Sequence, residues 1–229
     1  TKYKEKSIEK SKVFTIIPFG SNLDLNESKI LIEKTLKEAE ESKLCKNIII
    51  STNQNKIKNI IKSKKLKSIF SRPDFLNNEH ISIGDIIFSS LEKIENNFSK
   101  QDIIVVMDPS QPFRPKNIID KMLIKLKQSK SDSIIAVYPE QRNIFDIKKN
   151  GKIQINESNF IPRQFKEKKF LVSLFGTCFI TYAKFIRENS FFGKNIATFN
   201  IRNNVSNIQV RTKKDFNNLK ELKKFINSL

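Results

Sequence analysis

The chain has 229 residues, of which 38% are hydrophobic and 29% charged, and 43 Lys and Arg against 24 Asp and Glu give a net charge of +19. A chain of this size can bury roughly 70% of its unfolded surface, which excludes disordered, collagen-like and disulfide-dependent small proteins. Only 7 of the 43 basic residues are Arg. Because Arg is the residue that proteins prefer for recognising nucleic-acid bases and phosphates, we attribute the positive net charge to a Lys-rich composition and not to nucleic-acid binding.

Short apolar runs alternate with amphipathic stretches through the first 140 residues. The spacing predicts strands at 13–18, 47–52, 68–70, 102–107 and 132–138, and helices at 28–42, 54–63, 82–97 and 116–128. Lysines at 56, 58, 62, 64, 65 and 67 are expected on the polar faces of helices. Because strand and helix alternate, we predict an α/β fold with a mostly parallel sheet and helices on both faces.

The pattern changes after Pro139. Residues 145–147 and 152–155 flank a turn sequence ending in Gly151, which predicts a hairpin, and residues 170–182 predict a long strand interrupted by Gly176. Thr212 and Asp215 form a capping-box pattern before a final amphipathic helix. We therefore expect a mixed β segment, and in all a single domain over residues 13–229 after a polar extension over residues 1–12.

The cysteines and the start of the chain bear on the compartment. Cys45 and Cys178 lie in apolar runs far apart, as expected for buried thiols and not for a disulfide or a metal site. The first 12 residues lack a signal-peptide core, and no apolar run approaches the ~18 residues of a membrane span. We expect an unprocessed, cytoplasmic protein with no membrane partner. His80 is the only histidine, which excludes two-histidine metal motifs within the chain.

Two loops that follow predicted strands are candidate sites, because ligands of open α/β sheets bind beyond the carboxyl ends of the strands. The first, at 19–27, carries Gly20 just before a helix and could offer backbone N–H groups to phosphate, although a plain turn has the same pattern. The second, at 108–115, holds Asp108, Ser110, Gln111 and Arg114 between prolines. It offers a carboxylate, amide and hydroxyl groups and a cation; the alternative is a turn cap with a surface arginine.

The order of motifs carries a resemblance. The chain reads IIP, IIIST, SRPDFL, a Ser and Asp at a helix start, VVMDPSQPFR, SDSIIAVYP, RQ, a strand with a central glycine, and RTKKDF. This order resembles the acylneuraminate (CMP-sugar) cytidylyltransferases, which read IPAR-GGSK, VSTD, RP, LQPTSPLR, DSVVSV, RQ, NGAIYI and DIDTEEDF. The match covers nearly the whole chain after Val13, and VVMDPSQPFR with SDSIIAVYP is its most specific part.

The resemblance implies a Rossmann-like nucleotide-diphospho-sugar transferase (GT-A-like) fold. It also implies an enzyme that joins the α-phosphate of CTP to a hydroxyl of an acidic sugar and releases pyrophosphate with Mg²⁺. A homodimer is implied through residues 139–170, which lie on the acceptor side. The implied site residues are Arg72 and Ser82 for the cytidine and ribose, Gly20, Ser21 and Asn22 for the triphosphate, Asp108 and Arg114 as catalytic residues on the sugar side, and Gln111, Arg163 and Gln164 for the acceptor.

The chain departs from the family pattern at positions that bind the triphosphate, the metal or the sugar in the family. The first loop is shorter and has Phe19-Gly20 in place of Ala-Arg, and Phe175 replaces the strand asparagine. The two metal-binding aspartates of the family fall on Gln209 and Arg211. Two compensations are open hypotheses: Asp108 holds the metal instead, and Lys29 replaces a lost triphosphate contact. The alternatives are an inactive homologue that binds a nucleotide, a sugar or a protein, and an anion- or nucleic-acid-binding protein on the same fold.

Overall fold

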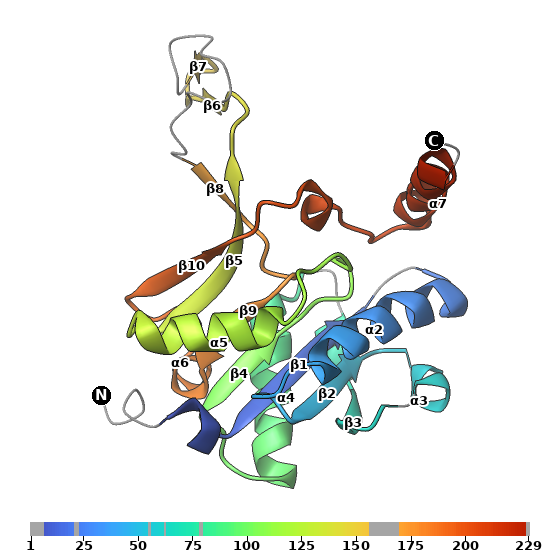
Figure 1. Cartoon of the computed structure of the whole chain (residues 1–229), viewed down its shortest axis with the longest axis vertical. Helices are drawn as coiled ribbons and strands as arrows, with labels where there is room; N and C mark the ends of the chain where they lie inside the picture. Colours follow the sequence, from blue (N-terminus) through green and yellow to red (C-terminus); the bar gives the residue numbers. More distant parts are fainter. Residues whose placement is uncertain are drawn as a thin grey trace.

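The computed structural model describes residues 7–20, 23–54, 56–61, 63–77, 80–155 and 170–227. A central sheet with helices on both faces forms the body, and a small hairpin projects from one end (Figure 1). The strands are β1 (Val13–Phe19), β2 (Asn47–Thr52), β3 (Leu66–Ser71), β4 (Ile103–Val106), β5 (Ser133–Glu140), β6 (Phe145–Ile147), β7 (Ile153–Ile155), β8 (Phe170–Ser173), β9 (Phe179–Tyr182) and β10 (Ile196–Asn200). The helices are α2 (Leu25–Glu40), α3 (Ile57–Ile60), α4 (Ile83–Asn97), α5 (Ile118–Gln128), α6 (Ala183–Arg187) and α7 (Lys213–Asn227), with short 3-10 turns η1 (Ile8–Lys10), η2 (Asp74–Asn77) and η4 (Asn204–Asn207).

The central sheet has the strand order β10-β5-β9-β4-β1-β2-β3, and β8 pairs with β5 beside it. The pairs β1–β2, β1–β4, β2–β3 and β5–β10 are parallel, whereas β9 lies antiparallel between β4 and β5. The predicted α/β class with a mostly parallel sheet is therefore confirmed. The strand expected at 170–182 with an interruption at Gly176 forms two separate strands, because Thr177 N donates to Leu174 O in a turn that separates β8 from β9.

The first strand shows why a continuous apolar run forms the centre of the sheet. Every residue of β1 is buried, since both neighbours in the sheet and helices on both faces cover it. Its pairing with β4 ends at Ile16, so Pro18, which has no N–H to donate, lies beyond that ladder and pairs only with Ser51 of β2.

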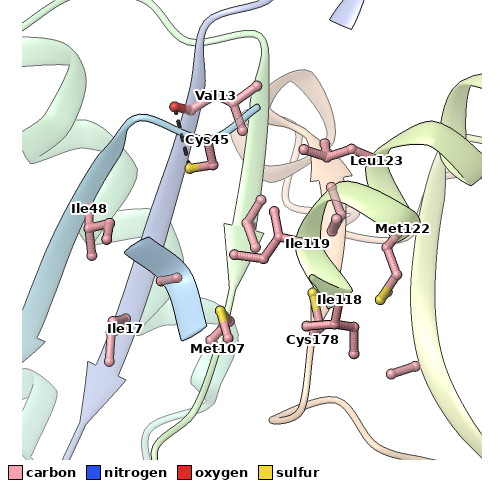
Figure 2. Close-up of a cluster of buried hydrophobic side chains, with 14 of the residues drawn as sticks. Val13, Ile17, Cys45, Ile48, Met107, Ile118, Ile119, Met122, Leu123 and Cys178 are labelled. Atoms are coloured by element: carbon pink, nitrogen blue, oxygen red, sulfur yellow. Dashed lines mark hydrogen bonds between the residues drawn. The ribbon is translucent and has the colours of Figure 1, made fainter. Parts of the chain in front are cut away.

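Two apolar clusters join the helices to the sheet. α2 and α5 cover one face, and α4 and α6 cover the other. Figure 2 shows Cys45 and Cys178 within the first cluster, among Met107, Ile118 and Met122. Both cysteines are free and buried, as predicted, and burial raises the pKa of Cys178 to about 12, which makes it an unreactive thiol.

The lysine-rich segment after β2 differs from the prediction. α3 spans only four residues, and Lys65 and Lys67 lie before and within β3 instead of on a helix. The side chain of Lys65 donates to the carbonyl oxygens of Glu40, the last residue of α2, and of Ser42, at 2.5 Å each. Lys64 N also donates to Glu40 Oε1. These bonds tie the segment to α2, so Lys65 is a structural contact and not a solvated charge.

The second half adds elements that the pattern did not predict. α6 and β10 follow β9, and Gly193, at a φ of 70°, makes a turn in which Asp132 Oδ2 accepts from Lys194 N and Asn195 N. The predicted hairpin is confirmed as β6 and β7, at the top of the view in Figure 1. Among the described residues, no helix is long and apolar enough to span a membrane.

Candidate active site

A cavity of about 620 Å³ lies at the carboxyl edge of the central sheet, where β1 and β4 end. Five segments line it: the end of β1, the start of α4, the loop after β4, the turn between β8 and β9, and the chain before α7. The lining residues are Phe19, Gly20, Ile81, Ile83, Ile86, Asp108, Ser110, Gln111, Ser173, Phe175, Gly176, Gln209, Val210 and Arg211. Both loops that the sequence singled out reach this cavity, which makes it the candidate active site.

Arg114 holds the loop after β4 in place. Its Nε donates to Thr177 O (2.8 Å), its Nη1 to Thr35 Oγ1 (3.0 Å), and its Nη2 to the carbonyl oxygens of Asp108 (2.6 Å) and Gly176 (3.0 Å). Burial lowers the pKa of Arg114 to about 10, and the negative charge of Asp108 opposes that shift. Arg114 is not among the residues that line the cavity. The geometry therefore favours a positioning role for Arg114 over the expected catalytic one.

The same loop presents polar groups to the cavity. Asp108 N donates to Gly176 O at 2.8 Å, and Asp108 Oδ1 accepts from Ser110 N at 2.8 Å, so the backbone fixes the carboxylate. Gln111 is 2% exposed, and its Oε1 accepts weakly from Thr177 Oγ1 at 3.5 Å. Ser110 Oγ is buried without a hydrogen-bond partner. Such an unpaired buried hydroxyl is costly and suggests that a ligand completes its hydrogen bonding.

The turn between β8 and β9 approaches this loop so closely that only glycine fits. A Cβ atom on Gly176 would lie 2.7 Å from Gln111 Oε1 and 2.9 Å from Asp108 Cβ. Phe175 beside it stacks on Phe179, with ring centroids 4.9 Å apart, and gives the cavity an apolar face. The strand glycine of the motif comparison thus packs against Asp108 and Gln111.

Arg72 lies with its side chain next to Gly20, the residue that follows β1. Its backbone N donates to Thr52 O and its Nη2 to Ser51 O, while its Nε is buried without a hydrogen-bond partner. A Cβ atom on Gly20 would lie 3.0 Å from Arg72 Nη1, so the missing side chain at Gly20 leaves the guanidinium next to the cavity lining. Burial lowers the pKa of Arg72 to about 10, and the charge of Asp108 opposes the shift.

Ser82 is the N-cap of α4. Its Oγ accepts from Asp85 N at 3.1 Å, and Asp85 Oδ2 accepts from Ser82 N at 3.2 Å, so the Ser and Asp of the motif form a capping box. Its two neighbours, Ile81 and Ile83, line the cavity. Ser82 therefore positions the first turn of α4 at the site, and its contact with a nucleotide remains a prediction.

The chain before α7 brings the two altered motif positions to the cavity. Val210 N donates to Ser110 O at 2.8 Å, which places Gln209 and Arg211 on the cavity wall. Arg211 N donates to Asp215 Oδ2 at 3.0 Å, and Asp215 also accepts from Thr212 in the predicted capping box. The resemblance pointed to this segment as part of the site, and the segment does line the same cavity as Asp108.

The remaining predicted site residues lie elsewhere or are not described. Lys29 lies on α2, outside the cavity lining, and pairs with Glu33 at 3.7 Å, so a triphosphate contact from Lys29 has no support in this geometry. Ser21, Asn22, Arg163 and Gln164 lie outside the described residues.

Sequence reasoning missed the apolar part of the lining and one hydroxyl group. Ile81, Ile83 and Ile86, and also Ser173, line the cavity but were not singled out. The sequence carried one signal, an isoleucine directly after the Ser82 cap. A residue at the first position of a helix is often accessible, and Ile83 is 39% exposed in the structure. Isolated exposed apolar residues are common, so the signal was weak.

The residues around the cavity do not fit a divalent cation held by the protein. Asp108 is the one carboxylate in the described lining, and Arg211 lines the same cavity. Within the described ranges, no three His, Cys, Asp or Glu side chains gather where they could bind a metal. Magnesium requires oxygen ligands, and nearby guanidinium groups repel it.

Comparisons with known proteins agree with this geometry. Residues 22–226 match the family model described as Cytidylyltransferase. Post-translational flagellin modification protein B of Campylobacter coli is 26% identical over 175 residues, and CMP-N,N'-diacetyllegionaminic acid synthase of Campylobacter jejuni is 24% identical over 175 residues; each alignment covers 74% of this chain and of the relative.

Two solved structures share the fold. The alignment with 4-diphosphocytidyl-2C-methyl-D-erythritol synthase of Anaerococcus prevotii has a TM-score of 0.68 at 14% identity, and it covers 95% of this chain and 98% of the synthase chain. A CMP:2-keto-3-deoxy-manno-octonic acid synthetase complexed with CTP has a TM-score of 0.63 at 13% identity and covers 96% and 100%. Because the family model spans most of the residues, the chain belongs to the cytidylyltransferase family, a family of nucleotidyltransferases.

Proposed function

We propose that this protein transfers CMP from CTP to a hydroxyl group of an acidic sugar and releases pyrophosphate. One observation carries the proposal: Asp108, Gln111, Gly20 and Arg211, from three separate segments, line one cavity at the carboxyl edge of the sheet. The relatives named for CMP-N,N'-diacetyllegionaminic acid and CMP-2-keto-3-deoxy-manno-octonic acid synthesis suggest the class of acceptor.

The cavity offers distinct surroundings for the parts of the substrates. Ile83, Ile86 and Phe175 supply apolar surface that suits a flat base, whereas Asp108, Ser110 and Gln111 supply hydrogen-bonding groups. In the proposed step the sugar hydroxyl oxygen bonds to the α-phosphorus, the bond from that phosphorus to the bridging oxygen breaks, and pyrophosphate leaves. Asp108 is the lining group able to accept the hydroxyl proton.

Arg114 serves the reaction indirectly in this proposal. Its guanidinium bonds to the carbonyl oxygens of Asp108 and Gly176, so it fixes the carboxylate and the glycine turn relative to each other. Phosphoryl transfer depends mainly on positioning and on charge placed near the phosphates, so a rigid loop of this kind is what the step requires.

We further propose a homodimer formed through residues 139–170 and a cytoplasmic location. Phe145, Ile147 and Ile153 of the hairpin are 59%, 73% and 68% exposed, which suits an apolar interface with a second copy. The buried free thiols Cys45 and Cys178 suit a reducing compartment. Arg163 and Gln164, in the proposed interface, remain predicted acceptor contacts.

The test is pyrophosphate release from CTP with N,N'-diacetyllegionaminic acid and 2-keto-3-deoxy-manno-octonic acid as acceptors. We expect release that depends on the acceptor, is lost in Asp108→Asn and is unchanged in the control Lys29→Ala. Release that is absent with intact CTP binding would favour the inactive homologue, which the replacement of two motif carboxylates by Gln209 and Arg211 also suggests. If the protein instead binds any polyanion, with an affinity that depends only on salt concentration, the alternative of an anion- or nucleic-acid-binding protein is favoured.

A further inference from the structure

Three arginines and three carboxylates lie at or beside the cavity: Arg72, Arg114 and Arg211, and Asp85, Asp108 and Asp215. Arg211 lines the wall, Arg72 lies beneath Gly20, and Arg114 lies under the loop that carries Asp108. Asp108 acts electrostatically on both Arg72 and Arg114. The carboxylates of Asp85 and Asp215 are held in capping boxes at the starts of α4 and α7, so in the described lining Asp108 alone faces Arg211 and the neighbouring Arg72. This arrangement favours a polyanion over a dication.

Arg211 is held where its charge reaches the cavity. The neighbouring Val210 N is bonded to Ser110 O, and Arg211 N is bonded to Asp215 Oδ2, so the backbone is fixed on both sides of the residue. No salt bridge within the described residues includes the Arg211 side chain. Its guanidinium is available to a ligand.

Arg72 supplies a second guanidinium, next to Gly20 at the end of β1. Its Nη2 is fixed by Ser51 O, its Nε is buried without a partner, and its Nη1 faces the space that a side chain at Gly20 would fill. An oxygen anion at the end of β1 would accept from Nη1, and the buried Nε without an acceptor shows that contacts within the described residues leave this guanidinium incompletely hydrogen-bonded.

We propose that this cavity binds the phosphate groups of its nucleotide directly through Arg211 and Arg72, so that nucleotide binding does not require a divalent cation. The proposal rests on the proposed function for the identity of the nucleotide. Guanidinium groups bind phosphate oxygens in pairs of parallel hydrogen bonds, which gives both charge and orientation. A Mg²⁺ ion on the triphosphate would reduce the charge that these arginines recognise. The hypothesis of Mg²⁺ on Asp108 predicts the opposite dependence.

The experiment is calorimetric titration of the full chain with CTP and, separately, with pyrophosphate, in excess EDTA and in excess Mg²⁺. We expect CTP to bind in EDTA with a Kd within about threefold of, or lower than, the value in Mg²⁺. Arg211→Ala should weaken binding in EDTA by about 10- to 100-fold, the range for a hydrogen bond to a charged group. The matched control Arg202→Ala, an exposed arginine outside the cavity lining, should bind as the parent does.

Arg211→Asp separates charge from shape. It should lose binding in EDTA and regain part of it with Mg²⁺, because the new carboxylate can hold a metal between protein and phosphate. CTP binding that requires Mg²⁺ in the parent chain would overturn this inference alone. Pyrophosphate binding in EDTA without CTP binding would support the arginine site and contradict the proposed function. No binding of either ligand in either condition would overturn both.

Discussion

The cavity and the projecting hairpin arm, formed by β6 and β7, differ in how their side chains are held. At the cavity, Arg114 alone makes four hydrogen bonds, three of them to backbone carbonyl oxygens that hold the loop after β4 against the turn at Gly176. On the arm, Phe145, Ile147 and Ile153 are mostly exposed, and among the described strands β6 and β7 pair only with each other. The cavity is thus organised by contacts within the chain, whereas the arm presents apolar surface that a second chain could cover. Substitutions in the first should disturb chemistry, and substitutions in the second should disturb assembly.

The largest effect is expected from Gly176→Val. A side chain there collides with Gln111 Oε1 and Asp108 Cβ, so both groups must move. We expect the CMP transfer rate to fall about 100-fold, the cost of a displacement near 1 Å in a positioned site. The comparison variant is Gly151→Ala on the arm, where a Cβ meets nothing within 4 Å but φ is 77°. It should lower stability by about 1 kcal/mol and leave CTP binding unchanged. Equal loss of transfer in both variants would contradict the assignment.

Arg114→Lys comes next. Lys can donate to some of the same acceptors but lacks the planar fork that reaches Thr177 O, Asp108 O and Gly176 O together. We expect a loss of about 2 to 3 kcal/mol in the free energy of unfolding and about 10-fold weaker CTP binding. Denaturant unfolding and calorimetry measure the two effects. Retained stability with lost transfer would instead indicate that Arg114 contacts the substrate.

The arm is tested by replacing its exposed apolar side chains. The double variant Phe145→Asp, Ile153→Asp places charges on a surface proposed to be buried in the dimer, and should raise the dimer dissociation constant at least about 10-fold. Sedimentation or light scattering over a concentration series gives this value. CTP binding per chain should be unchanged, since neither residue lines the cavity. A parent chain that is monomeric at all concentrations would exclude the proposed interface.

The smallest effect concerns the base of the arm. The side-chain hydrogen bonds from Arg142 lower the pKa of Glu140 to about 2, from its ordinary value of 4.5. Because the folded-state pKa is depressed, the charged form stabilises the fold above about pH 4.5, and this contribution is lost as the pH falls toward 2. Glu140→Gln should flatten the decline of Tm in that window. An unchanged pH profile would show that the pair does not contribute.

The sequence predicted the sheet well and the site in part, for physical reasons. Continuous apolar runs such as 47–52 predicted their strands, because strands buried on both faces need such runs. α3 was overpredicted, since the contacts of Lys65 with Glu40 and Ser42 join residues far apart in the chain. The resemblance pointed to Asp108, Gln111, Gln209 and Arg211, and all four line the cavity. It could not show that Arg114 is turned toward backbone carbonyls, because that depends on the turn at Gly176.

The most direct test of the central claim is the selectivity of nucleotide binding. CTP, UTP, ATP and GTP are titrated into the parent chain at one salt concentration, so that phosphate charge is equal and only the base differs. We predict that CTP binds at least about tenfold more tightly than the other three, a difference of about 1.4 kcal/mol. Equal affinity for all four, or binding of none, would contradict the assignment of this cavity as a cytidine nucleotide site.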